Sequence, residues 1–248
     1  MIRPKRPAQV EKMRRAGSVT AAVLRAVARK VAPGVRTIEL DEIAERMIRR
    51  RGGKPLFKGY RGYPYTLCVS VNEEVVHGMP SERVLQEGDI VSVDVGVRLD
   101  EWCGDSAVTL PVGRIDDSAQ RLVSGSRRAL EVAVQTIGPG VRLAEVCGAI
   151  QKFAESLGYS VVREFTGHGI GRDMHEEPQV PNFVAPSMAN PVLKPGMTLA
   201  IEPMLNAGTA DVKVLENGWT VVTSDGKLSS HAEHTVVVTE DGADVLTR

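Results

Sequence analysis

Apolar residues recur at alternating steps of three and four along the first part of the chain. This spacing predicts one face of a long helix that ends at Pro33-Gly34. A second helix is expected from about Thr37 to Arg50. The inward-facing residues of the first helix are Val10, Met13, Gly17, Thr20, Leu24, Val27 and Val31, and those of the second are Leu40, Ile43, Met47 and Ile48.

The hydrophobic period changes towards two between Tyr65 and Leu110. The valines at 91, 93, 95 and 97 alternate with mostly polar residues, which predicts a strand with one apolar face. Two more helices are expected over roughly Ser118–Ile137 and Leu143–Leu157. Strand-like segments broken by glycine and proline then run from Val161 to the end. The pattern therefore predicts an α+β protein.

Two stretches of the first half recur in the second half at an offset of a little over one hundred residues. The sequence Pro-Gly-Val-Arg precedes a helix at 33–36 and again at 139–142. The segments 88–94 and 196–202 each end an apolar strand on a carboxylate. Chance remains an alternative, since Pro-Gly after a helix is common, but the agreement of two separate segments favours duplication. We expect one catalytic domain over 1–248, with halves at roughly 8–112 and 118–248 related by a pseudo-twofold axis.

Composition narrows the classes of partner. The chain has 248 residues, 42% of them hydrophobic and 25% charged, and its formal net charge is zero. A net charge of zero gives no strong overall electrostatic field to attract nucleic acid or membranes. No apolar run is long enough for a membrane span. The three widely spaced cysteines give neither a disulfide framework nor zinc-finger spacing. We expect a cytoplasmic protein without a signal peptide, a membrane partner or a specific DNA partner.

Positive charge gathers near the start of the chain. One interpretation is a solvated helix face, and the other is contact with an acidic partner such as ribosomal RNA. The residues concerned are Arg3, Lys5, Arg6, Lys12, Arg14 and Arg15.

The first candidate site residues are Asp94 and Asp105. If a hairpin turns at Asp100-Glu101, paired residue numbers sum to 201, so Asp94 faces Ala107 and Asp105 is its diagonal neighbour on the same face. Such neighbours have Cβ atoms up to roughly 7–8 Å apart. Two carboxylates that point the same way repel each other unless a divalent cation or a proton intervenes. The alternative is that one of them faces water on an edge strand.

A glycine-rich segment carries two histidines, His168 and His175, seven residues apart. This is not the four-residue spacing of a zinc-binding helix, and a straight strand would put them on opposite faces. Both face one site only if the segment turns, which its three glycines make easy. A phosphate-binding loop is the alternative, but no Lys-Ser/Thr pair follows.

Two more carboxylates interrupt or precede apolar strands, namely Glu202 before Pro203 and Glu233 before 235–238. Charged residues in such runs are seldom buried without a partner, although either could face water at a strand end. Four carboxylates and one or two imidazoles form a donor set that suits Mn, Fe, Co or Zn. This set is unlike the thiolate ligands of a structural zinc site. The four carboxylates also suit two cations bridged by shared carboxylates, about 3.5–4 Å apart.

The chain resembles type I methionine aminopeptidases of the short bacterial kind over essentially its whole length. The resemblance implies the pita-bread fold, an α+β arrangement of two similar halves whose antiparallel sheet is covered by helices. It rests on residues 69–78, 88–94, 104–106, 167–171, 175–178, 201–204 and 233–235.

The resemblance implies removal of the initiator methionine from nascent proteins and peptides by a monomeric enzyme with two divalent ions (Co, Mn, Fe, Zn or Ni). Asp105 and Glu233 would bridge the ions. The implied metal ligands are Asp94, Asp105, His168, Glu202 and Glu233. The implied catalytic residues are His77, His175 and Glu202. The residues that would contact the substrate are His77, His175, Tyr60, Tyr63, Cys68, Met174 and Trp219, with Phe57 nearby.

Two rival functions stay open on the same fold. A proline-directed aminopeptidase or dipeptidase generally carries an additional N-terminal domain, for which we expect this chain to be too short. A metal-free binding protein is the other rival, and the presence of all five ligand residues argues against it.

Overall fold

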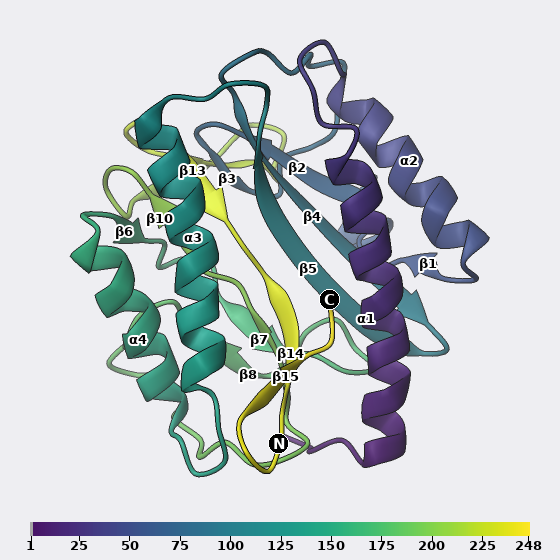
Figure 1. The fold of residues 1–248 in the computed structure, drawn as a ribbon, viewed down its shortest axis with the longest axis vertical. Helices are drawn as coiled ribbons and strands as arrows, with labels where there is room; N and C mark the ends of the chain where they lie inside the picture. Colours follow the sequence, from purple (N-terminus) through teal and green to yellow (C-terminus); the bar gives the residue numbers. More distant parts are fainter. Residues whose placement is uncertain (1) are drawn as a thin grey trace.

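The computed structural model describes residues 2–248, so the first residue of the predicted domain lies outside the described part. Four helices flank the strands (Figure 1). The pair α1 (Pro7–Ala28) and α2 (Thr37–Arg50) lies on one flank, and α3 (Asp117–Thr136) and α4 (Leu143–Ser156) lie on the other. Among residues 2–248, no helix is both long and apolar enough to cross a bilayer.

The helix predictions are close to the observed bounds. The second helix spans the predicted residues, and α3 and α4 differ from prediction by a single residue at their ends. The first helix stops earlier than expected, at Ala28 instead of Pro33-Gly34. Val31 still packs against the core from the following turn, which explains why the apolar pattern continues beyond the helix.

The strands form four antiparallel sheets, two of them large. In the first half, β4 pairs with β1, β2 and β5, and in the second half the order is β15-β14-β9-β7-β8. Two three-stranded sheets, β13-β10-β6 and β11-β12-β3, lie beside them. The strand bounds are β1 Lys54–Pro55, β2 Leu67–Val71, β3 Glu74–Val76, β4 Ile90–Leu99, β5 Trp102–Pro111, β6 Ser160–Val161, β7 Gly167–Gly169, β8 Glu176–Val180, β9 Thr198–Ile201, β10 Met204–Asn206, β11 Val212–Val214, β12 Val221–Thr223, β13 Ser229–His231, β14 His234–Val238 and β15 Ala243–Val245, and a short 3-10 helix spans Tyr60–Gly62.

The β4–β5 hairpin has the predicted register. Asp94 pairs with Ala107, and the turn residues Asp100 and Glu101 adopt left-handed backbone angles, φ 48° and 69°. The predicted apolar face of β4 packs in the core, and the polar face of the strand is covered as well. Ser92, for example, is buried and shares a hydrogen bond with the side chain of Thr109, which in turn donates to a carbonyl of β13. This polar interior lies where the halves meet.

The repeated Pro-Gly-Val-Arg segments have the same local structure. The amide of Gly34 donates to the carbonyl of Leu85 (2.8 Å), and the amide of Gly140 donates to the carbonyl of Leu193 (3.0 Å). Both glycines have positive φ angles, 90° and 87°. Equivalent turns with equivalent strand contacts are what internal duplication predicts.

Helix α1 packs closely on the outer face of β5, one residue before Asp105. A Cβ added at Gly104 would lie 2.8 Å from the backbone nitrogen of Gly17 and 2.9 Å from the hydroxyl of Thr20. That hydroxyl donates to the carbonyl of Gly104 itself (3.1 Å). Glycine at both positions therefore lets the helix approach the strand, and this contact sets the position of the strand that carries Asp105.

Replacement of Gly104 by alanine should therefore lower the free energy of unfolding by about 1–3 kcal/mol, the usual cost of overpacking. Chemical denaturation measures the change. Gly138→Ala is the matched control, because a Cβ there meets only ordinary contacts at 3.8 Å. That control should be neutral or stabilising by up to about 1 kcal/mol. Equal stability of the two variants would contradict the close α1–β5 contact.

Candidate metal centre

The five predicted metal-ligand residues come from five different segments and line one cavity of about 390 Å³. Asp94 and Asp105 lie on paired strands of the first half. His168 lies on β7, Glu202 follows the end of β9, and Glu233 lies between β13 and β14. The cavity therefore receives side chains from both halves of the chain, as the carboxylate-ending strands predict.

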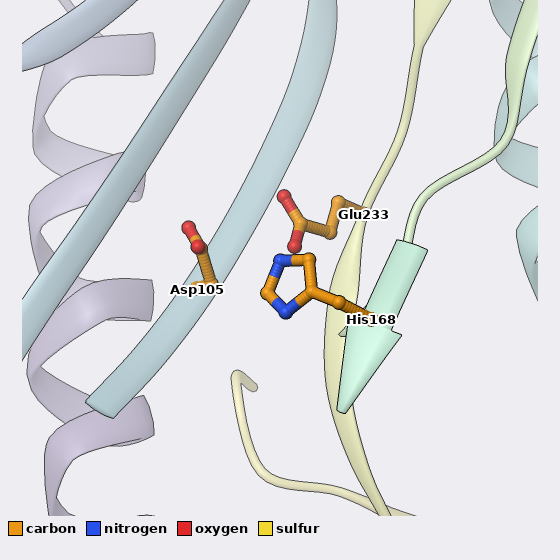
Figure 2. Close-up of side chains that lie close together, drawn as sticks. All are labelled: Asp105, His168 and Glu233. Carbon is orange, nitrogen blue, oxygen red and sulfur yellow. The ribbon is translucent and has the colours of Figure 1, made fainter. Parts of the chain in front are cut away.

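Three of the five converge most tightly. Asp105, His168 and Glu233 each offer an atom within 4.8 Å of the others, and all three side chains are buried (Figure 2). In Figure 2 the carboxylate of Glu233 lies directly above the imidazole of His168, and the carboxylate of Asp105 lies to its left. The acid group of Glu202 lies close by, with its Oε1 atom 3.7 Å from Nε2 of His168.

A backbone contact fixes the orientation of the His168 ring. Its Nδ1 atom lies 2.8 Å from the carbonyl oxygen of Gly169, so Nδ1 carries the proton in the neutral ring. This arrangement leaves the lone pair of Nε2 pointing towards the acidic groups. Metal-binding histidines are commonly oriented in this way by a partner on the other ring nitrogen.

The four carboxylates are too close and too buried to be stable as free anions. Burial raises the pKa of Asp105 to about 7. The pKa values of Asp94, Glu202 and Glu233 are also raised well above their usual range, first by burial and then by repulsion from neighbouring acids. Within residues 2–248, one buried oxygen each of Asp94, Asp105 and Glu233 lacks a hydrogen-bond partner.

These residues fit divalent cations. Orphaned carboxylate oxygens beside an imidazole nitrogen form an oxygen-rich donor set, which suits first-row divalent ions. Burial, with a smaller contribution from His175, lowers the pKa of His168 to about 4, so its ring is neutral and able to act as a ligand at physiological pH. Cations would remove both the repulsion and the unsatisfied oxygens.

The glycine-rich segment turns as its composition predicts, and this brings His168 and His175 together. Strands β7 and β8 form an antiparallel pair around the turn. The ring centroids of the two histidines are 4.2 Å apart. The Nδ1 atom of His175 lies 2.9 Å from the hydroxyl of Tyr60, and the ring is exposed at the mouth of the cavity. Burial and Arg61 lower the pKa of His175.

His77 lies on another wall of the same cavity. Its backbone is left-handed, with φ 58°, and its ring packs edge-on against Phe165 at a centroid distance of 5.4 Å. Burial, with a smaller contribution from His175, lowers the pKa of His77 to about 4. Its ring is therefore neutral near physiological pH and offers both a donor and an acceptor to a substrate.

Aromatic and sulfur-containing side chains form the rest of the wall. Cys68 pairs with Asp94 across β2 and β4, so it stands next to the acidic cluster. The ring of Tyr63 packs edge-on against Trp219 at 5.0 Å, while its hydroxyl donates to the carbonyls of Leu67 and Gly78. The predicted pocket residues that line this cavity are Phe57, Tyr60, Tyr63, Cys68, Met174 and Trp219.

Sequence analysis did not identify one buried histidine beside the acids. The Nε2 atom of His231 lies 3.9 Å from Oε2 of Glu202 and lacks a hydrogen-bond partner in the described part of the chain. Burial lowers its pKa to about 3. Its position two residues before Glu233 was the available signal. His234, the residue after Glu233, instead faces away from the acids, and its Nδ1 atom lies 2.9 Å from the hydroxyl of Thr247.

The chain is similar in sequence to proteins of known type. The model of the family described as Metallopeptidase family M24 matches residues 11–240. A protein named methionine aminopeptidase 1 from Bacillus subtilis is 49% identical, with all of both chains covered. The methionine aminopeptidase of Escherichia coli K12 is 45% identical over 98% of this chain and 92% of the relative.

Solved structures agree with this assignment. A methionine aminopeptidase from Thermotoga maritima is 48% identical and superposes with a TM-score of 0.97 over the whole of both chains. A prolidase from Pyrococcus furiosus shares only 22% identity, and its TM-score of 0.81, over 99% of this chain and 65% of the other, shows the shared fold alone. These likenesses confirm the pita-bread α+β fold. Because the family model matches most of the chain and the full-length relatives are close in sequence, the chain belongs to metallopeptidase family M24.

Proposed function

We propose that this protein is a methionine aminopeptidase that removes the initiator methionine from nascent proteins and peptides. The observation that carries the proposal is the convergence of four carboxylates and His168 at a cavity with aromatic and sulfur-containing walls. The relatives that match the chain at full length are named for this activity.

We assign the metal-binding role to Asp94, Asp105, His168, Glu202 and Glu233. They would hold two divalent ions (Co, Mn, Fe, Zn or Ni), and Asp105 and Glu233 have the most buried side chains among the four acids. When bound, such ions lower the pKa of a shared water and polarise the substrate carbonyl.

The residues of the chain would then divide the proton transfers and the positioning. Glu202, at the edge of the acidic cluster, accepts the proton of the attacking water. His175, at the mouth of the cavity, donates a hydrogen bond to the carbonyl oxygen as negative charge develops there. His77, which lines the same cavity, holds the backbone of the scissile amide or of the second residue.

The wall of the cavity suits a methionine side chain. Methionine is unbranched and its sulfur is polarizable, so it makes favourable contacts with aromatic rings and with other sulfur atoms. Tyr63, Trp219 and Cys68 supply such groups next to the acidic cluster. Tyr60 and Met174 would complete the pocket, with Phe57 beside them.

A proline-directed peptidase is the weaker alternative. The likeness to the prolidase is a likeness of fold alone, at 22% identity, whereas the chain is 49% identical to a protein named methionine aminopeptidase 1. A metal-free binding protein would leave the buried carboxylate oxygens without partners, which the structure makes costly.

The remaining partners follow from the proposed activity. We infer that a single domain over 1–248, with halves at roughly 8–112 and 118–248, acts as a monomer in the cytoplasm. Nascent chains would be its substrates. Ribosome contact through the basic N-terminal residues stays a prediction, and several of those residues already pair within the chain, such as Arg14 with Asp244 and Arg15 with Asp100.

Peptide cleavage tests the proposed function directly. Met-Ala-Ser and Met-Gly peptides should be cut, and Met-Lys, Met-Phe and Ala-Pro peptides should be poor substrates. Norleucine should replace methionine better than leucine does, because it is unbranched; a misplaced methylene in an apolar pocket costs about 1–3 kcal/mol. Chromatography of the released products measures the turnover of each peptide. Equal turnover of Leu-Ala and Met-Ala peptides would contradict a methionine-shaped pocket.

The two neighbouring histidines should differ when each is replaced by alanine. His175→Ala should keep its metal and lose roughly 10²–10³ in kcat, the usual effect of losing one oxyanion donor. His168→Ala should bind metal weakly, and excess metal should restore turnover only in part. Metal analysis and kinetics on both variants decide the assignment. Asp173→Ala, an exposed neighbour in the same turn, is the control and should behave as wild type. Metal loss in His175→Ala alone would reverse the two roles.

Metal binding should release protons near neutral pH. The raised pKa values mean that the metal-free acids hold protons that bound cations must displace. Affinity should therefore rise between about pH 6 and pH 8. The metal-free fold should lose stability as the pH rises through about 7, the value for Asp105, because a carboxyl with a raised folded-state pKa stabilises the fold only while it is protonated.

Calorimetric titration with Mn²⁺ in two buffers of different ionisation enthalpy measures the released protons. Thermal denaturation of the metal-free protein on either side of neutral pH measures the loss of stability. Binding without proton release, or a metal-free protein whose stability does not change with pH in this window, would show that the four acids are already ionised.

A further inference from the structure

The segment that precedes α1 is attached to the loop that carries His175. The ammonium group of Lys5 contacts Oε2 of Glu176 at 2.5 Å, and its backbone amide donates to the carbonyl of Gly196 (2.6 Å). The Lys5 side chain is only 9% exposed and that of Glu176 is 25% exposed. Lys5 therefore belongs neither to a solvated helix face nor to a surface free for an acidic partner.

Glu176 in turn holds the loop between β7 and β8. Its Oε1 atom accepts hydrogen bonds from the backbone amides of Arg172 (2.9 Å) and Asp173 (3.4 Å). Within the loop, the amide of Gly171 donates to the carbonyl of Asp173 (3.1 Å), and the carbonyl of Gly171 accepts from Cys103 of β5 (2.9 Å). One carboxylate thus connects Lys5 to the backbone of the whole turn.

The lysine also packs against this turn. A Cβ added at Gly171 would lie 2.6 Å from Cε of Lys5, so the methylene stem of the lysine fills the space that a side chain would need. The turn ends in Met174 and His175. Met174 is buried in the wall of the cavity, and the His175 ring stands 4.2 Å from the ring of His168. A shift of the turn would move both residues relative to the acids.

We propose that Lys5 is a positioning residue for His175 and acts through Glu176. The inference rests on the proposed aminopeptidase function, because the role of His175 belongs to it. An exposed ion pair would contribute little. The Lys5–Glu176 pair is largely buried, so removal of the cation leaves Glu176 partly buried and unpaired. The carboxylate would then turn towards water and release the amides of Arg172 and Asp173. A misplacement of about 1 Å at a reacting group can reduce turnover by up to about 10².

Lys5→Met tests the proposal because it keeps the length of the stem and removes the charge. With a Met-Ala-Ser peptide and saturating Mn²⁺, kcat should fall about tenfold or more, while the metal content stays at the wild-type level and KM changes less. Lys5→Arg should recover most of the loss, since it restores the cation. Hydrogen–deuterium exchange of residues 171–176 should be faster in Lys5→Met than in the wild type, and this measurement needs no activity.

Two further variants separate positioning from general stability. Lys12→Met removes an exposed charge of α1 and should match the wild type in kcat and in exchange. Glu176→Gln should lower kcat. The double variant Lys5→Met with Glu176→Gln should have a kcat no lower than that of the poorer single variant, because both substitutions remove the same Lys5–Glu176 connection. Additive losses would show that Lys5 acts by another route.

The outcomes distinguish this inference from the proposed function. An inactive wild-type enzyme would contradict the aminopeptidase assignment. An active wild type beside a Lys5→Met variant with normal kcat and normal exchange would overturn only the role of Lys5. Loss of kcat accompanied by loss of metal would also overturn it, since the effect would then arise at the ligands instead of at His175.

Discussion

The mutual repulsion of four enclosed carboxylates is the constraint on which the rest of the structure depends. Burial raises the pKa of all four acids, and repulsion from neighbouring carboxylates raises the pKa values of Asp94, Glu202 and Glu233 further. A fold gains nothing from such a cluster unless cations neutralise it. The surrounding structure therefore has to hold the acids rigidly enough for cations to bind between them.

Rigidity comes from packing on the outer faces of the strands. The valines of β4 pack against α1 and α2 in one apolar cluster, while the opposite face of the same strand presents Ser92 and Asp94 to the interior. Close approach of α1 to Gly104 fixes β5 directly beside Asp105. The apolar faces supply the folding energy, and the polar faces are left free to form the site.

Local patterns predicted the parts of the structure that depend on short-range rules. The β4–β5 register followed from one turn at Asp100-Glu101, and the helices followed from their apolar spacing. Contacts between distant segments were not predictable in this way. Asp41 of α2, for example, is buried and accepts hydrogen bonds from the amides of Thr66 and Leu67 at the start of β2. His231 and Lys5 likewise depend on partners far away in the sequence.

The site takes its acidic side chains from both the first and the second half of the chain. Asp94 and Asp105 come from the first half, whereas His168, Glu202 and Glu233 come from the second. The backbone of Glu233 also exchanges hydrogen bonds with Ala107 of β5 (2.9 and 3.4 Å), so a direct strand contact joins the halves beside the acids. Cations shared across this contact would stabilise it further, because separation of the halves would then return uncompensated charges to each face. The same electrostatic demand would therefore favour metal binding and hold the halves together.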